Sequence, residues 1–204
     1  MDHQVQALHG ILPVLPTPFT DTGTVDTDAM AEIVEFALEA GVSGVVYPGF
    51  ASEVLELTCA ERSELLEVVV ERANGKTQII AGASGVDAAE TVEHGRRAGA
   101  LDVHLLMVQP PRGLGDDLEH LCGFFGEVTN ALPHARFVLQ NAPAPRGSDL
   151  APDTICRISA RFPQIAYVKE ETLPAGPAIS DVLSNRPPTL KGVIGGGGAR
   201  FILD

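Results

Sequence analysis

Lysine is scarce in this chain of 204 residues, and one of the three lysines stands where it could act as a nucleophile. Lys76 and Lys191 come just before apolar runs, whereas Lys169 closes one. A lysine among apolar neighbours loses ammonium stability, so its pKa falls and the neutral amine can attack a carbonyl. An ion pair with Glu170 or Glu171 would explain the same position, because structural ion pairs also occur at strand ends. The residues alone leave both interpretations open.

Other side chains could share this chemistry. Side chains alternate along a regular strand, so Tyr167 and Glu171 would lie on the same face as Lys169. We hypothesise that one of these two supplies acid or base function. Arg146 follows an expected strand end and could bind a carboxylate through two parallel hydrogen bonds, as could Arg112 less favourably.

The elements that must position these residues alternate between short β-rich runs and longer helical patterns. One helix start is marked by Thr58 and Glu61, which form a capping-box pattern. We expect strands at residues 11–16, 42–47, 78–81, 103–108, 136–139, 165–169 and 190–194. We expect helices at residues 26–40, 58–73, 87–98, 116–131, 152–161 and 178–184.

Apolar strands that alternate with helices predict a parallel sheet covered by helices. Such a sheet can be open and doubly wound, or closed as a barrel. No Gly-x-Gly-x-x-Gly follows the first strand, which favours the barrel. A TIM (β/α)8 barrel has eight strands and about 250 residues. We therefore expect residues 1–204 to form one α/β barrel domain truncated after strand seven, as a fragment of a longer protein.

The composition excludes several classes of protein. The formal net charge is −13, without the basic footprint of a nucleic-acid binder. The chain shows neither an apolar leader nor a membrane-length apolar run, so we expect a soluble cytoplasmic protein with no membrane partner. The three cysteines, Cys59, Cys122 and Cys156, are far apart, which suggests neither a disulfide framework nor a metal site.

Four motifs add a family resemblance. Residues 10–19 read Gly-Ile-Leu-Pro-Val-Leu-Pro-Thr-Pro-Phe, and residues 49–58 keep Gly49, Glu53, Leu57 and Thr58 of a G-T-T-G-E…L-T loop. Residues 140–143 and 147–150 resemble Y-N-x-P…G-x-D-L, and residues 168–170 resemble I-K-E. In this order and spacing, the motifs resemble the dihydrodipicolinate synthase/N-acetylneuraminate lyase family along essentially the whole chain.

The resemblance implies a barrel enzyme in which Lys169 forms a Schiff base with pyruvate or a related 2-oxo acid. It implies aldol cleavage or condensation without metal or organic cofactor, in a homo-oligomer (a dimer or tetramer). Backbone N–H groups of the loop containing Phe50 and Ala51 would hold the substrate carboxylate. We also expect substrate contacts at Arg146 and at Gly195, although the glycine run 195–198 is more typical of a close-packed turn than of a phosphate loop.

The sequence departs from the family in its proton relay. Gln140 stands at the catalytic position where the family has a tyrosine, and an amide is no acid or base near neutral pH. Phe50 and Ala51 replace two threonines, and residues 109–112 (Gln-Pro-Pro-Arg) replace T-P-Y-Y. Pro145 takes the place of the substrate-binding arginine, which is shifted to Arg146.

Three functions therefore remain open. The leading one is a Schiff-base aldolase acting on a 2-oxo acid, with Lys169, Tyr167 and Gln140 at the catalytic position. The second is a Schiff-base dehydratase acting on a 2-keto-3-deoxy sugar acid. The third is a barrel that has lost catalysis and acts as a binding or regulatory protein, since fold alone does not fix function.

Overall fold

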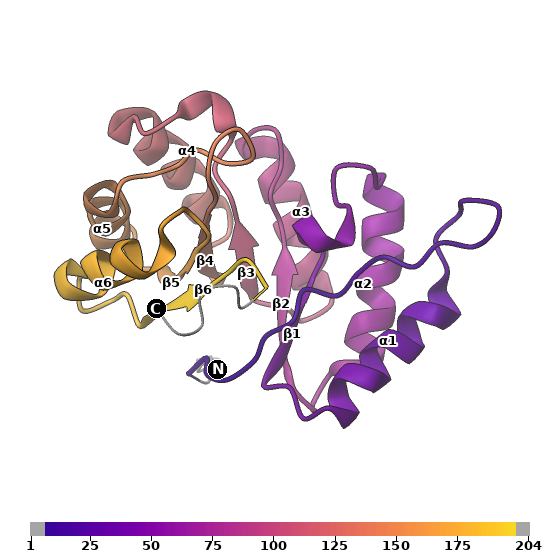
Figure 1. Ribbon diagram of the computed structural model, residues 1–204. Coiled ribbons are helices and arrows are strands. Elements are labelled where there is room, and N and C mark those ends of the chain that lie inside the picture. Colours follow the sequence, from indigo (N-terminus) through magenta and orange to yellow (C-terminus); the bar gives the residue numbers. More distant parts are fainter. Residues whose placement is uncertain (1–6, 199–204) are drawn as a thin grey trace. The chain divides into compact units, whose positions relative to one another are not determined.

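A computed structural model of the chain describes residues 7–198, in which strands and helices alternate (Figure 1). The helices are α1 (Thr27–Glu39), α2 (Cys59–Ala73), α3 (Ala88–Ala100), α4 (Leu118–Ala131), α5 (Pro152–Arg161) and α6 (Ala175–Asn185). The strands are β1 (Gly44–Tyr47), β2 (Gln78–Gly82), β3 (Leu105–Val108), β4 (Arg136–Asn141), β5 (Ile165–Glu170) and β6 (Gly192–Gly195). Short 3-10 turns, η1 (Phe50–Ser52) and η2 (Arg112–Leu114), follow β1 and β3.

The order of the strands decides between the two architectures that the sequence allowed. The sheet has the order β1-β2-β3-β4-β5-β6, the order of the strands along the chain. A doubly wound sheet reverses its order at a switch point, whereas successive βα units of a barrel follow one another around it. The fold is therefore the truncated (β/α) barrel expected from the sequence.

The chain forms two compact units. The first comprises Met1–Ala83 and His94–Leu106, and the second comprises Ser84–Glu93 and Met107–Asp204. Within residues 7–198, no helix combines the length and the apolar character needed to cross a membrane.

In the first unit, β1 and β2 are parallel, with Gly44 opposite Gln78 and Tyr47 opposite Ala81. The first expected strand, residues 11–16, is reduced to a single bridge between Val14 and Val46. Its backbone accepts a 2.9 Å hydrogen bond at the carbonyl of Pro13 and donates a 3.0 Å one from Leu15. Proline has no N–H to donate, so a segment with prolines at 13 and 16 cannot extend a ladder.

Helices α1 and α2 begin where the sequence predicts, because side chains cap them. Asp26 accepts the backbone N–H of Ala29 at 2.9 Å and caps α1. At α2, the Thr58 hydroxyl accepts the Glu61 N–H at 3.2 Å, and the Glu61 carboxylate accepts the Thr58 N–H at 2.8 Å. This confirms the predicted capping box. The Glu61 carboxylate accepts hydrogen bonds from both the backbone N–H and the hydroxyl of Thr58, and these two bonds lower the pKa of Glu61.

In the second unit, β4, β5 and β6 form consecutive parallel pairs. The register places Lys169 between Gln140 of β4 and Ile194 of β6, and Glu170 between Asn141 and Gly195. Phe125 and Phe137 are fully buried in its core. The strands therefore bring residues from β4, β5 and β6 to the same carboxyl-terminal edge of the sheet.

Candidate active site

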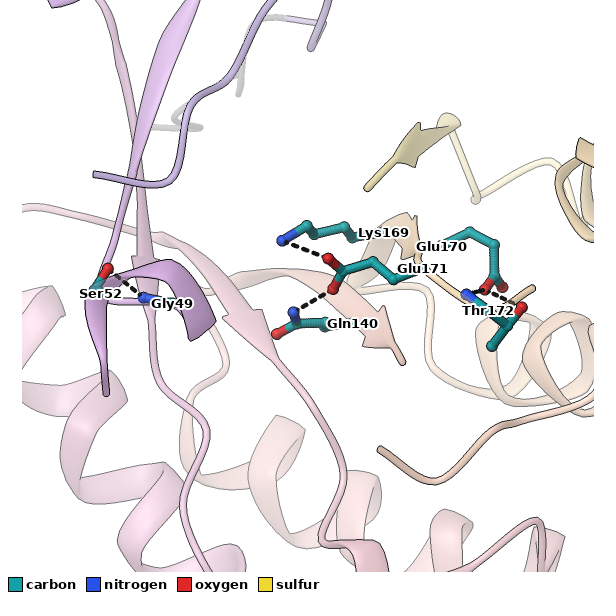
Figure 2. A network of polar contacts seen from close by, with 7 residues as sticks. All are labelled: Gly49, Ser52, Gln140, Lys169, Glu170, Glu171 and Thr172. Atoms are coloured by element: carbon teal, nitrogen blue, oxygen red, sulfur yellow. Dashed lines mark hydrogen bonds and ion pairs between the residues drawn. The ribbon is translucent and has the colours of Figure 1, made fainter. Parts of the chain in front are cut away.

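Lys169 lies near the end of β5 with a side chain that is only 11% exposed. Its Nζ lies 3.5 Å from Oε1 of Glu171, the residue that follows the strand (Figure 2). The alternation of side chains predicted that these two residues share a face, and the ion pair shows that they do. Of the two glutamates considered as partners from the sequence, Glu171 is therefore the one that pairs with the lysine.

Glu171 is held by a second partner from the neighbouring strand. The side-chain amide of Gln140 donates from Nε2 to Oε2 of Glu171 at 2.6 Å. The backbone N–H of Glu171 also donates to the carbonyl of Asn141 at 2.9 Å, which continues the pairing of β4 with β5 past the strand end. Figure 2 shows the side chains of Lys169 and Gln140 converging on this carboxylate. Each of its oxygens thus has its own partner.

Gly196 packs closely against the same carboxylate. Its N–H donates to the carbonyl of Glu170 at 2.9 Å. A Cβ at residue 196 would lie within 2.7 Å of Cδ and Oε1 of Glu171, so any side chain there would displace the carboxylate. Sequence reasoning placed Gly195 at the site. The structure places Gly195 opposite Glu170 in the β5–β6 register, and the next glycine is the one against Glu171.

Glu170 points away from Lys169 and has a structural role. Its side chain is fully buried, and Oε1 accepts the N–H and the hydroxyl of Thr172 at 2.7 and 2.5 Å. Its Oε2 accepts Nδ2 of Asn141 at 2.9 Å. Figure 2 shows the Glu170 and Thr172 pair on the side opposite the Lys169 and Glu171 pair. The two adjacent carboxylates therefore have different roles, one anchoring the loop and the other facing the lysine.

Asn141 ties the loop after β4 to the end of β5. Besides its bond to Glu170, its side chain accepts the N–H of Leu150 at 2.9 Å and donates to the carbonyl of Leu150 at 3.0 Å. A Cβ at Gly147 would collide with the backbone of Ala142, so this loop folds back on itself tightly. The signal in the sequence was the Asn-x-Pro…Gly-x-Asp-Leu motif, which did not reveal what the asparagine binds.

Arg146 lies in this loop, and the segment after β3 braces it. Gln109 donates from Nε2 to the carbonyl of Arg146 at 3.0 Å, and Arg112 donates from Nη1 to the carbonyl of Pro145 at 3.1 Å. The guanidinium of Arg112 therefore supports the loop, and a carboxylate contact by Arg112 stays a prediction from the sequence. The carboxylate contact of Arg146 remains a prediction.

Tyr167 lies two residues before Lys169 on β5 and is 5% exposed. It stands opposite Val138 and Gly192 in the sheet register. A Cβ at Gly192 would lie 3.8 Å from the Tyr167 ring, an ordinary packing distance. The proton-transfer role hypothesised for Tyr167 remains a prediction.

Phe50 and Ala51 belong to the first unit, where they form the turn η1 with Ser52. Ser52 holds this turn: its hydroxyl accepts the N–H of Gly49 at 2.9 Å and donates to the carbonyl of Leu15 at 2.5 Å (Figure 2). Sequence reasoning missed this serine, whose only signal was its place in the altered Gly-Thr-Thr-Gly-Glu motif. The backbone contact of Phe50 and Ala51 with a substrate carboxylate stays a prediction.

Tyr47 and Thr17 stabilise the turn η1 through buried hydrogen bonds. Thr17 donates its hydroxyl to the carbonyl of Ser52 at 2.6 Å, and its oxygen lies 3.1 Å from the Tyr47 hydroxyl. Burial raises the pKa of Tyr47 to about 12, and the hydrogen bond between Tyr47 and Thr17 acts in the opposite direction. Tyr47 is thus held in its protonated form and serves as a core aromatic.

With this geometry in place, comparison with known proteins identifies the family. A model of the dihydrodipicolinate synthetase family matches residues 7–176. The chain belongs to this family. The match extends through β5 and includes Lys169, Gln140 and the turn η1.

Curated family members match the chain over part of their own length. The 4-hydroxy-tetrahydrodipicolinate synthase of Stenotrophomonas maltophilia strain R551-3 is 36% identical over 167 residues, which cover 80% of this chain and 54% of that protein. The synthase of Thermus thermophilus is 32% identical, with coverage of 80% and 54%. The chain therefore spans about half the length of these dihydrodipicolinate synthetase family members.

Solved structures of family members share the fold. Dihydrodipicolinate synthase from Rhodopseudomonas palustris aligns with a TM-score of 0.85 at 25% identity, covering 97% of this chain and 65% of that one. The N-acetylneuraminate lyase (sialic acid aldolase) of Aliivibrio salmonicida aligns with a TM-score of 0.84 at 20% identity, covering 95% and 64%. At that identity the second alignment shows the common fold alone.

Proposed function

We propose that this dihydrodipicolinate synthetase family protein is a lyase that binds pyruvate or a related 2-oxo acid as a Schiff base on Lys169. Aldol cleavage or condensation then takes place at the carbon next to the imine. The observation that carries the proposal is the position of Lys169, a nearly buried amine at the carboxyl end of a barrel strand with a carboxylate 3.5 Å away. Barrel enzymes carry their catalytic groups at this end of the strands.

The chemistry of the pair supports this function. A lysine that forms an imine must lose its proton before it attacks, and a carboxylate within reach can accept that proton. The resulting imine withdraws electrons from the neighbouring carbon, so a carbon–carbon bond can form or break there without a metal. Arg146, on its braced loop, is the side chain that we propose for binding the substrate carboxylate.

Reductive trapping tests the proposal. The protein is incubated with pyruvate and sodium borohydride, digested and analysed by mass spectrometry. We expect one adduct, on the peptide containing Lys169, and none on the peptides containing Lys76 and Lys191, which are internal controls in the same sample. A K169A variant should form no adduct, and K191A should trap pyruvate as the wild type does. No adduct in the wild type, or equal labelling of all three lysines, would refute the proposal.

A further inference from the structure

Because Gln140 stands at the position of a tyrosine, another residue must transfer protons during the proposed reaction. Imine formation and removal of a proton from the adjacent carbon both need a group that accepts and returns protons. Gln140, which stands where the family resemblance expects a tyrosine, has an amide that cannot do this. Its Nε2 instead donates to Glu171 at 2.6 Å, and Glu171 reaches Lys169 at 3.5 Å.

We propose that Glu171 is the catalytic proton-transfer residue of this site and that Gln140 is the residue that positions it. This inference rests on the proposed function, because it assumes that Lys169 forms an imine. It assigns the acid and base work to a carboxylate two residues after the lysine, on the same face.

The hydrogen bonds of Glu171 give its two oxygens different roles. An amide N–H can only donate, so Gln140 occupies Oε2 as an acceptor. The donor at Oε2 disfavours a proton there, so the proton that the carboxyl group takes up goes to Oε1, the oxygen that faces Nζ of Lys169. Gly196 closes in from another side and leaves the carboxylate little freedom to turn. The carboxylate is thus preorganised with its basic oxygen toward the reacting amine.

Glu170 cannot take this role, although it is the immediate neighbour of Lys169. Its side chain is fully buried, and its two oxygens already accept hydrogen bonds from Thr172 and Asn141. The Glu171 side chain is 15% exposed, so a proton that it holds can exchange with solvent.

The steps balance with Glu171 alone. The Lys169 ammonium gives a proton to Oε1, and the neutral amine attacks C2 of the 2-oxo acid, forming the C–N bond and moving the C=O π electrons onto oxygen. That oxygen takes the proton from Glu171, and the positively charged nitrogen returns one to Glu171. The carbinolamine hydroxyl then leaves with this proton as water while the nitrogen lone pair forms the C=N bond. The products are a protonated imine, water and the original carboxylate.

After the imine has formed, Oε1 of Glu171 also acts in the next step, the removal of a proton from the substrate carbon. The Glu171 carboxylate removes a proton from C3, whose bonding electrons form the C2=C3 bond while the C=N electrons return to nitrogen. The result is an enamine and a protonated Glu171. In deuterated water the acid exchanges its proton for a deuteron, and the reverse step then places deuterium on C3. Pyruvate alone is therefore enough to report on this residue, with no acceptor aldehyde.

The experiment measures deuterium incorporation into the methyl group of pyruvate by NMR, beside borohydride trapping on Lys169. We expect E171Q to lower the exchange rate by about 100-fold or more, the range of a lost general base. The same variant should reach the wild-type endpoint of trapped Lys169, only more slowly. E171D, which keeps the carboxylate, should recover part of the exchange. E127Q, the same substitution at an exposed position of α4, should exchange at the wild-type rate.

Gln140 gives a separate readout of positioning. Q140L removes the donor to Oε2 but leaves both Lys169 and Glu171 in place. We expect it to lower the maximal exchange rate, between E171Q and wild type, with little change in the KM for pyruvate. An unchanged rate would remove Gln140 from the inference.

The outcomes separate this inference from the proposed function. Normal trapping with wild-type exchange in E171Q would overturn the role of Glu171 and leave the imine intact. Loss of exchange in Y167F but not in E171Q would move the role to Tyr167. An E171Q protein that never traps pyruvate would show that Glu171 only holds Lys169 in place, which also overturns the inference. If the wild-type protein formed no adduct, the proposed Schiff base on Lys169 would itself be refuted.

Discussion

At the scale of single residues, the alternation of side chains along the chain gives two adjacent glutamates different partners. Glu170 turns to one side and holds Thr172 and Asn141, while Glu171 turns to the other and meets Lys169 and Gln140. A shift of the strand by one residue would exchange these two environments. The anchored glutamate therefore fixes the register that presents the lysine pair.

This division predicts different effects of the same substitution. Both carboxylate oxygens of Glu170 accept hydrogen bonds. In E170Q an NH2 group replaces one of these oxygens, so a buried donor loses its acceptor. We expect the free energy of unfolding to fall by about 1.5–3 kcal/mol, the range for hydrogen bonds to charged groups. Urea denaturation measures it. The matched control is E127Q, the same exchange at an exposed position of α4, which should stay within about 0.5 kcal/mol of wild type. Equal stability of E170Q and E127Q would contradict the anchoring role.

The sequence predicted part of this residue-level arrangement. The shared face of Lys169 and Glu171 follows from the two-residue repeat of a strand, and the structure confirms it. The bond between Gln140 and Glu171 joins residues 31 apart and depends on the register of β4 against β5, which no local pattern encodes. The close approach of Gly196 to the Glu171 side chain could not be predicted from the sequence, because it depends on the register of β5 against β6.

At the scale of elements, local signals predicted the helices better than the first strand. The capping box at Thr58 and Glu61 and the proline at the start of α5 are short-range signals, and both helices begin where expected. The prediction of a first strand at residues 11–16 was wrong in extent. Its prolines lack an N–H, so its pairing with β1 is limited to one bridge.

The capping box gives a testable stability effect. T58A removes the hydroxyl that accepts the N–H of Glu61, and we expect it to lower the free energy of unfolding by about 1 kcal/mol. The control is T22A, whose hydroxyl bonds only to Thr20 in an exposed turn and caps no helix. A T58A protein as stable as T22A would contradict the role of the cap.

The same box predicts a pH dependence. The pKa of Glu61 is lowered in the folded protein, chiefly by its hydrogen bond from the Thr58 backbone. Its contribution to stability is therefore present above the ordinary carboxyl pKa and is lost as the pH falls through the lowered folded value. Between E61Q and wild type, the difference in unfolding midpoint should shrink as the solution is acidified through this window. A difference that grows on acidification would contradict the assignment.

At the scale of the whole molecule, composition and periodicity carried the prediction of fold. Alternating apolar strands and helices indicated a parallel sheet, and strands arranged in chain order make it a barrel of the dihydrodipicolinate synthetase family. The family resemblance predicts a lysine near the end of β5, and Lys169 lies there. It does not explain Gln140 at the tyrosine position, and that departure is what directs attention to Glu171.

The most direct measurement is a crystal structure of the protein soaked with pyruvate. We expect continuous electron density from Nζ of Lys169 to C2 of pyruvate, with Oε1 of Glu171 facing the bound methyl carbon and Oε2 still hydrogen-bonded to Gln140. Pyruvate bound without a covalent link, or linked to another lysine while Lys169 keeps its ion pair with Glu171, would contradict it.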